Sequence, residues 1–479
     1  MPWREQLQPV RMTRVALVAP VESLRDVLVR TADAGVVELD SAAPEQAGVG
    51  AAEALLQRIR REPAAVVVCP AAPDLERLAR KGRVDLLAGE AQLEARASEA
   101  VVRGNVAALV GWMPEKARTG LAARLAEMGG AIVPLRHPRG AEAPSLLPGR
   151  GVRRSAAALV ETYGAVPYSD VDPTPFAWAA YVLMFGMMFG DAGHGLLLLA
   201  GAVALLAGRP RFLRRFRRAW PFVAGAGLAS ALFGFLYGEF FGPTGVVPVL
   251  WLSPVDDPVA LMAAALGVGA VLLACSYAIG AVNRWREGGW PVVLYDPSGL
   301  AGASLFFGLG AVAAGLYLGH PWLVTSGVIL AVAGLVLGFA GFLAAAGPIA
   351  PGIAVAAVEL IDLVVRLGAN VVSFVRLAAF GLAHGALASI VWTGTTILWQ
   401  RGGAHILAAL AVFGIGNAVA FAFEALVAGV QALRLEYYEL FSRLFRTSGR
   451  PFRPWHIPVV TEPVSPRLTE GVDDPCPQN

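Results

Sequence analysis

Residues 372–384 read VSFVRLAAFGLAH and place Arg376 in the middle of a run that otherwise has the composition of a membrane-buried helix. Upstream of it, residues 297–358 contain no Asp, Glu, Lys or Arg. A charged side chain at the centre of a bilayer costs about 2.5 kcal/mol or more, and such residues usually face a wet cavity or an ion path. The position of Arg376 therefore indicates a functional site inside a membrane.

The composition of the whole chain is that of a membrane protein. The 479 residues are 56% hydrophobic and 16% charged, whereas soluble proteins carry about 25% charged residues. The mean hydropathy is +0.58. A net charge of +3 is too small to favour a nucleic-acid partner, and we expect none.

The first third of the chain has the alternation of a soluble α/β fold. Residues 14–20 and 36–40 are predicted strands on either side of an amphipathic helix at 21–35. Strand, helix, glycine stop and strand follow again in residues 105–135. Between these units lie polar helical stretches within residues 41–104. The pattern predicts two small α/β lobes joined by a short helical arm.

Beyond residue 170 the apolar runs reach the roughly 20 residues that a bilayer-spanning helix needs. Six arginines fall between residues 209 and 218, whereas residues 242–257 contain neither Arg nor Lys. Because positive residues stay in the cytoplasm, and the start of the chain lacks the apolar core of a signal peptide, two crossings must precede residue 209. We therefore predict eight spans, at residues 174–190, 192–207, 219–241, 258–282, 299–318, 321–344, 354–398 and 404–441.

These patterns predict a mainly α-helical membrane protein in three parts. Residues 1–170 form a cytoplasmic N-terminal α/β domain with a short helical arm. Residues 171–446 form an eight-helix transmembrane domain, and residues 447–479 form a polar, proline-rich tail. The last two spans exceed the length of a perpendicular crossing, so we expect them to be strongly tilted. Both termini are expected in the cytoplasm.

The last two predicted spans also carry ionisable residues in a repeated order. At 100° per residue, Asp362 and Arg376 lie within about 40° of each other and about 21 Å apart along a continuous helix. Arginine does not lose its charge by deprotonation. An acid, a gap and an arginine occur on both helices, which suggests two half-paths for a cation with a positive barrier between them. The further polar residues on these helices are Ser373, His384, Glu424, Gln431 and Arg434.

Several motifs resemble subunit I, also called subunit a, of the rotary V/A-type ATPases. The seventh and eighth predicted spans carry the most specific of them, SFVRLAAFGLAHGALAS at 373–389 and FEALVAGVQALRLEYYELFSRLF at 423–445. The other matching stretches are VAALVGWMPEK at 106–116, YSDVDPTPFAWAAYVLMFGMMFGDAGHG at 168–195 and GFLYGEFFG at 234–242. The resemblance covers nearly the whole chain.

The resemblance implies a role for five of these polar residues and none for Ser373 or Gln431. Arg376 would face the carboxylates of a rotating membrane ring, and Arg434 would support it. Glu424 would be the carboxylate of one half-channel, His384 would be a polar lining residue, and Asp362 would lead into the other half-channel. The family usually has a long helical hairpin between its soluble lobes, and residues 41–104 are too few for one.

The resemblance also implies partners. These are the ring of carboxylate-bearing membrane subunits, peripheral stalk subunits, a soluble V1/A1-type ATPase motor with its central rotor, and the lipid of a prokaryotic plasma membrane. The chain would be a subunit that does not bind nucleotide, because it lacks the phosphate-cradling pattern GxxxxGK[ST]. Proton and sodium transport are both open, as are ATP synthesis and ATP hydrolysis.

No cofactor or metal is expected from the sequence. Asp191 and His194 have a metal-like spacing, but no third ligand is apparent, and a hairpin between the first two spans is the preferred interpretation. Two other functions compete with that of a rotary stator. One is a membrane anchor or assembly subunit without transport. The other is a secondary transporter, which usually shows two related halves; the sequence has no such repeat.

Overall fold

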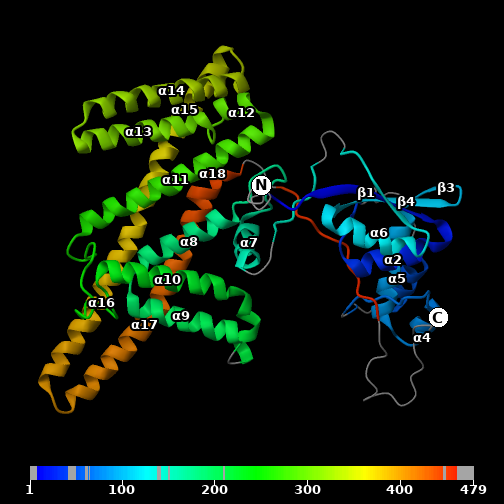
Figure 1. The fold of residues 1–479 in the computed structure, drawn as a ribbon, viewed down its shortest axis with the longest axis horizontal. Coiled ribbons are helices and arrows are strands. Elements are labelled where there is room, and N and C mark those ends of the chain that lie inside the picture. The colour runs from blue at the N-terminus through cyan, green and yellow to red at the C-terminus, as the bar shows by residue number, and fades with distance from the viewer. Residues whose placement is uncertain are drawn as a thin grey trace. The chain divides into compact units, whose positions relative to one another are not determined.

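The computed structural model describes residues 8–40, 50–59, 63, 65–137, 142–148, 152–208, 211–445 and 449–460. The chain divides into two compact units (Figure 1). The first, which we call the membrane unit, comprises Met1–Pro9 and Leu147–Ser448. The second, the α/β unit, comprises Val10–Leu146 and Gly449–Asn479, so it is built from two distant parts of the sequence.

One antiparallel sheet organises the α/β unit. Its strand order is β2-β4-β1-β5, with β3 paired to β4. One helix connects β1 to β2 and another connects β4 to β5, which gives the split βαβ arrangement of a ferredoxin-like fold. The prediction of two separate lobes is therefore wrong, because β1 and β4 pair along their whole length. The elements are β1 (Met12–Pro20), α2 (Leu24–Ala34), β2 (Glu38–Leu39), β3 (Val101–Arg103), β4 (Val106–Pro114), α6 (Arg118–Ala126) and β5 (Ala131–Pro134).

The described helices of the expected arm pack against this sheet domain. They are α3 (Ala51–Ile59), α4 (Leu75–Arg80) and α5 (Val84–Ser98), and α5 contacts both α2 and α3. Arg25 of α2 forms an ion pair with Glu90 of α5, and Leu93 of α5 is buried in the same core as Leu28 of α2. The described part of residues 41–104 thus extends the core of the α/β unit.

A segment near the C-terminus completes the α/β unit. The Trp455 amide donates to the Val37 carbonyl (2.8 Å), and Val459 forms a bridge with Val68. Ile457 is only 1% exposed and belongs to the core under the sheet. Part of the predicted tail therefore packs in the α/β unit, while its residues from Thr461 onward lie outside the described ranges.

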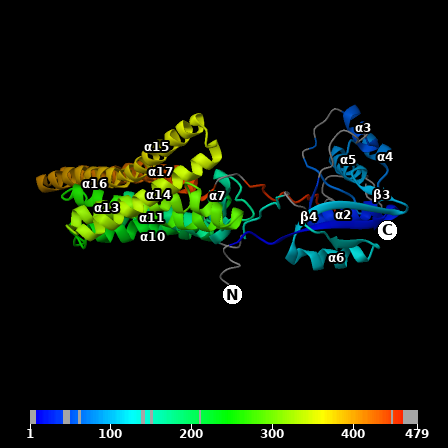
Figure 2. The same ribbon diagram turned by 90° about the horizontal axis from the view of Figure 1, so that it is seen from above.

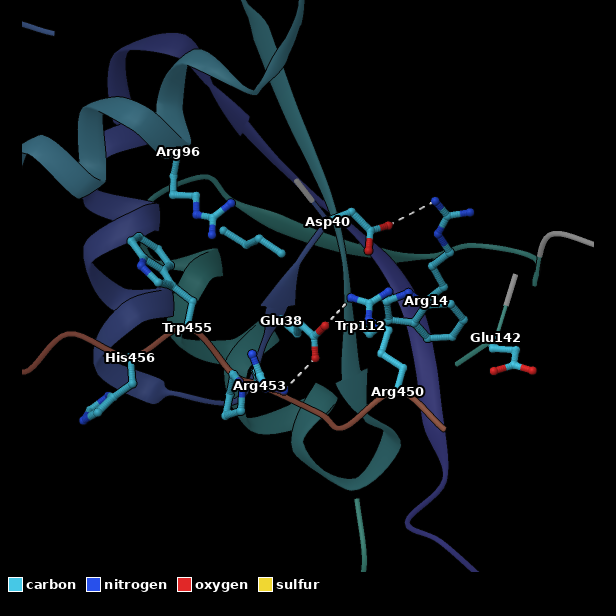
Figure 3. A pocket seen from close by; sticks show the side chains of 12 residues that line it. Arg14, Glu38, Asp40, Arg96, Trp112, Glu142, Arg450, Arg453, Trp455 and His456 are labelled. Carbon is cyan, nitrogen blue, oxygen red and sulfur yellow. Dashed lines mark hydrogen bonds and ion pairs between the residues drawn. The ribbon is translucent and has the colours of Figure 1, made fainter. Parts of the chain in front are cut away.

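Glu38 on β2 binds this C-terminal segment through an ion pair and a hydrogen bond. Its carboxylate pairs with the Arg450 guanidinium and accepts the Arg453 amide (2.7 Å), as Figure 3 shows. The segment borders a cleft of about 1010 Å³ that also contains Arg14 and Arg96. Arg14 is paired with Asp40 and Arg96 with Glu99. Since three of the four arginines here already have carboxylate partners, we assign the cleft to docking of the segment and not to a ligand.

We expect Ile457→Ala to loosen the C-terminal segment. Truncating a buried isoleucine typically costs about 2–5 kcal/mol, whereas Ile→Val costs about 1 kcal/mol. Hydrogen exchange of the full chain should show faster exchange at the Trp455 and Ile457 amides in Ile457→Ala and a smaller change in Ile457→Val. Amides of α6 serve as the internal control. Complete exchange of the segment within seconds in the unaltered protein would contradict its packing.

The membrane unit is entirely helical in its described residues (Figures 1 and 2). Five stretches are long and apolar enough to cross a membrane by length and composition: Arg214–Tyr237, Pro258–Gly288, Trp290–Leu318, Pro321–Ala346 and His405–Leu444. Two apolar helices are shorter, Thr174–Met188 and Ala192–Ala207. The helices are α7 (Val152–Tyr163), α8 (Thr174–Met188), α9 (Ala192–Ala207), α10 (Trp220–Tyr237), α11 (Pro258–Gly288), α12 (Trp290–Tyr295), α13 (Leu300–Leu318), α14 (Pro321–Ala346), α15 (Ala350–Ser373), α16 (Val375–Arg401), α17 (His405–Leu435) and α18 (Ser442–Leu444).

The segment predicted as one span at 354–398 consists of two helices, α15 and α16, which meet at Phe374. The Phe374 amide bonds to the Val371 carbonyl (3.1 Å), one residue short of the α-helical partner. The Phe374 side chain is fully buried against α11, where a Cβ on Gly269 would lie 2.2 Å from its ring. Figure 2 shows α15 leaving the line of α16. The spacing of about 100° per residue therefore does not hold across Phe374, and the angle predicted between Asp362 and Arg376 on one continuous helix does not apply.

The last long helix changes its winding near its end. Helix α17 is regular to Leu435 and continues as the π-helical turn Glu436–Phe441 before α18. A π turn closes its hydrogen bonds between residues five apart, and such turns occur often at functional sites. Helices α16 and α17 form an antiparallel hairpin (Figure 1).

Candidate functional site

The polar residues of the α16–α17 hairpin fall into two groups. The first, the arginine cluster, consists of Ser373, Arg376, Gln431, Arg434 and Glu439. The second, the histidine cluster, contains His384 and Glu424 together with three residues from other helices, Asp191, His194 and Glu239. Each cluster combines residues that are distant in the sequence.

Arg376 lies in the first turn of α16, and its Nη1 is buried without a hydrogen-bond partner among the described residues. Two buried acceptor atoms of the same cluster, Gln431 Oε1 and Glu439 Oε2, are also unpaired within the described structure. Glu439 interacts electrostatically with both Arg376 and Arg434. Buried polar atoms are normally hydrogen-bonded, so this cluster can still accept a polar partner.

Glu439 is a member of the cluster to which the sequence assigned no role. On a regular α-helix, Arg434 and Glu439 would point about 140° apart, because they are five residues apart. The π turn at Glu436–Phe441 closes over five residues and brings them toward one side. An analysis of sequence periodicity assumes α-helical winding throughout. It therefore could not predict the π turn or the position of Glu439.

Asp362 and Ser373 lie on the other side of the Phe374 junction. Asp362 is ion-paired with Arg366 on the same helix, and its side chain is 49% exposed. The Ser373 hydroxyl donates to the Ala369 carbonyl (2.9 Å). A cleft of about 670 Å³ opens beside them, lined by charged and polar residues of α15 and of the end of the last helix: Glu359, Arg366, Asn370, Tyr438 and Arg443.

His384 and Glu424 meet directly in the histidine cluster. His384 Nδ1 is hydrogen-bonded to a carboxylate oxygen of Glu424, which joins α16 to α17. The other ring nitrogen, Nε2, lies 3.8 Å from Glu239 Oε2. His384 is 3% exposed and Glu239 5%. The structure thus brings together His384 and Glu424, which the sequence named separately as ion-path residues, and adds a second buried carboxylate.

His194 and Asp191 come from the start of α9 and complete this cluster. The His194 and His384 rings lie 5.8 Å apart between centroids, and His194 Nδ1 is 3.8 Å from Asp191 Oδ1. Ligand atoms of Asp191, His194 and His384 all lie within 4.8 Å of one another, so these three could hold a metal ion. The third ligand that the sequence lacked therefore comes from α16, about 190 residues away along the chain.

Asp191 also has a structural role as the cap of α9. Its Oδ1 accepts the amides of His194 (2.9 Å) and Phe241 (3.0 Å), and its Oδ2 accepts the Gly242 amide (2.9 Å). Two of these donors belong to the loop that follows α10. One carboxylate thus fixes the start of α9 and the backbone next to Glu239.

A helical unit with apolar spans and buried arginine, histidine and carboxylate groups defines an integral membrane protein built around ionisable side chains. Residues 102–247 match the sequence model of the V-type ATPase 116 kDa subunit family. The match covers the end of the α/β sheet and helices α8 to α10.

Several curated relatives extend the match over more of the chain. The A-type ATP synthase subunit I of Thermococcus kodakarensis is 27% identical over 379 residues, which are 73% of this chain and 54% of the relative. The A-type ATP synthase subunit I of Aeropyrum pernix is 30% identical over 353 residues. This alignment covers 62% of this chain and 49% of the relative. The V-type ATP synthase subunit I 2 of Treponema pallidum is 44% identical over 88 residues, 18% of this chain and 19% of the relative. The chain spans about half the length of the first two relatives.

We expect Asp191→Ala to destabilise the membrane unit more than the removal of an exposed carboxylate does. The variant leaves three amides without their acceptor, and each unpaired buried group costs about 1–3 kcal/mol. Asp191→Asn keeps one acceptor oxygen and should lose less. Thermal unfolding of the purified protein in detergent is the measurement. The unfolding temperature should be lowest for Asp191→Ala, intermediate for Asp191→Asn and highest for the unaltered chain. Asp256→Ala, an exposed acid in the loop before α11, is the control. Equal stability of Asp191→Ala and Asp256→Ala would contradict the capping role.

Proposed function

We propose that this chain is the ion-translocating stator subunit of a V/A-type rotary ATPase. The observation that carries the proposal is the buried donor of Arg376, which has no partner among the described residues and lies on the same hairpin as the His384–Glu424 pair. The match of residues 102–247 to the V-type ATPase 116 kDa subunit family supports the assignment. Arg376 is the stator arginine, Arg434 supports it, and Glu424 with His384 forms one half-path.

An exposed apolar stripe on α17 supports a contact with a partner inside the membrane. Its members recur every three or four residues, which places them on one helix face: Ile415, Val419, Phe423, Leu426 and Val430, all more than half exposed. Arg434 follows at the next position of this face and is itself exposed. We propose that this face and Arg376 adjoin the rotating ring of carboxylate-bearing subunits.

The proposed mechanism uses two offset paths. Glu424 and His384 pass the ion on one side, and the cleft beside α15, with Asp362 near it, serves the other. A ring carboxylate neutralised by its ion turns through lipid. When it reaches Arg376, the fixed positive charge favours its ionised form, so it releases the ion. Because arginine stays charged, it also blocks direct passage between the paths.

The topology that fits this function has eight crossings. Helices α8 and α9 supply the first two as a hairpin, and the arginines between residues 211 and 218 face the cytoplasm with both termini. The α/β unit meets the peripheral stalk subunits, and the soluble motor with its central rotor couples ring rotation to ATP. The chain itself binds no nucleotide in this proposal. Its membrane is the prokaryotic plasma membrane.

We expect Arg376→Lys to reduce coupled ion transport by about two orders of magnitude, because lysine lacks the planar fork of donors and loses its proton more readily in an apolar setting. Arg376→Ala should abolish coupled transport and allow some passive leak. The measurement is ATP-driven ion uptake by vesicles that contain equal amounts of unaltered or variant complex.

Two outcomes decide the role of Arg376. Normal uptake by Arg376→Lys would contradict the need for arginine, and normal uptake by Arg376→Ala would overturn the stator function. Arg401→Ala serves as the control, because Arg401 ends α16 at its far end and is exposed. An anchor subunit without transport predicts that all three variants support equal uptake.

Glu424→Gln should slow uptake to about a tenth or less and leave the amount of assembled complex unchanged. Glutamine retains a hydrogen bond to His384 but cannot exchange a proton, and groups that transfer protons typically contribute 10²–10⁴ in rate. Quantitative immunoblotting of the membranes, alongside the uptake assay, separates assembly from flux. If assembly fails while the remaining complexes transport normally, Glu424 is structural.

A further inference from the structure

The histidine cluster has the composition and geometry of a metal-binding site. We infer that Asp191, His194, Glu239 and His384 bind a divalent transition-metal ion of the zinc class, and that a bound ion inhibits transport. The four side chains come from the start of α9, the loop after α10 and the middle of α16. The inhibitory effect rests on the proposed function, whereas metal binding does not.

Ligand atoms of Asp191, His194 and His384 lie within 4.8 Å of one another, and Glu239 adjoins this group at His384. Asp191 Oδ1 lies 3.8 Å from His194 Nδ1, and Glu239 Oε2 lies 3.8 Å from His384 Nε2. In tetrahedral zinc sites with bonds of about 2.0–2.2 Å, neighbouring ligand atoms are about 3.3–3.6 Å apart. The observed pairs need to approach by only a few tenths of an ångström.

Four nitrogen and oxygen atoms of the proposed ligands have no partner among the described residues, whereas Asp191 Oδ1 already accepts the His194 and Phe241 amides. Both ring nitrogens of His194, His384 Nε2 and Glu239 Oε2 are buried and have no hydrogen-bond partner among the described residues. Leaving a buried polar atom unpaired costs about 1–3 kcal/mol. Three side chains with such atoms converge at one place, and every atom is of a type that ligates metal. One cation would satisfy several of them together.

Neighbouring groups already orient the ligands. Glu424 is hydrogen-bonded to His384 Nδ1, so Nε2 presents its lone pair when Nδ1 carries the proton. A carboxylate that holds a ligating histidine in this way is typical of zinc sites. Gly385 lets Glu239 come close to α16, since a Cβ there would lie 2.8 Å from Glu239 Oε1.

The surroundings favour zinc over harder cations. The Phe189 ring stacks on His194 with centroids 5.5 Å apart, and Phe241 meets the same ring edge-on at 5.2 Å. These rings form an apolar wall around the ligands. Two imidazole nitrogens with carboxylate oxygens suit zinc, whereas magnesium and calcium prefer sites made entirely of oxygen.

Metal binding at His384 has a consequence for transport. An ion on Nε2 places positive charge next to the His384–Glu424 pair, through which we propose that the transported cation passes. The positive charge of the metal ion repels the transported cation, and His384 no longer has a free Nε2 to bind it. Both effects oppose that passage. Zinc should therefore inhibit ion uptake from the side that Glu424 serves.

The test is zinc titration of the complete purified complex with the unaltered chain or one variant. Bound zinc per complex is measured by mass spectrometry after free zinc is removed, and X-ray absorption reports the ligands. We expect one more tightly bound zinc ion in the unaltered complex than in His194→Gln or Glu239→Gln, whose affinity should fall by about 100-fold or more. Glu424→Gln, which replaces the carboxylate that orients His384 with a neutral amide, should lose about 10–100-fold.

Matched controls keep the outcome clear. His405→Gln changes an exposed histidine at the start of α17, and Glu436→Gln changes a buried carboxylate outside the cluster; both should bind zinc like the unaltered chain. Equal zinc content in the unaltered, His194→Gln and Glu239→Gln complexes would overturn the metal site and leave a purely hydrogen-bonded cluster. Stoichiometric binding without inhibition of uptake would overturn the inhibitory role.

Arg376→Ala separates this inference from the proposed function. Arg376 lies outside the histidine cluster, so the variant should bind zinc normally while its transport is lost. Normal transport by Arg376→Ala would refute the stator function without affecting the zinc measurement. An absence of the extra zinc in a complex whose transport depends on Arg376 would refute the metal site alone.

Discussion

The hydrogen bond between His384 and Glu424 sets the geometry on which the candidate site depends. It joins α16 to α17 in an apolar environment, where an unpaired polar group is costly. Arg376 precedes His384 by eight residues, or about 12 Å, and Arg434 follows Glu424 by ten, or about 15 Å. Because the helices are antiparallel, these offsets bring both arginines to the same end of the hairpin.

Close backbone packing places the rest of the histidine cluster. A Cβ on Gly195 would lie 2.4 Å from the Ala231 amide nitrogen, and one on Gly234 would lie 2.0 Å from that of Ala192. Small residues at such contacts let membrane helices approach closely. The α9–α10 pair therefore brings His194 and Glu239 to the same depth, where both can reach His384.

Much of this architecture could be predicted from the sequence, because long apolar runs and strand–helix alternation are local signals. The resemblance of their helices to one family marked His384 and Glu424 as residues of the ion path, whereas their direct hydrogen bond is known only from the structure. The single α/β sheet could not be predicted, because it depends on long-range pairing between β1 and β4. The burial of Ile457 in the same core likewise brings together parts of the chain that are distant in the sequence. The Phe374 junction and the π turn before α18 alter helix phase through tertiary packing, which periodicity does not record.

In the proposed function, the two clusters use different chemistry because one keeps a permanent positive charge and the other exchanges a cation. Arginine stays charged under all physiological conditions, so Arg376 and Arg434 supply a constant potential that a mobile carboxylate can meet and leave. Histidine changes its charge near neutral pH and can also ligate a metal. His384 and His194 can therefore pass or hold a cation, whereas the arginines can only repel one. Their separation along one hairpin keeps the exchangeable site away from the permanent charge, which a directional ion path requires.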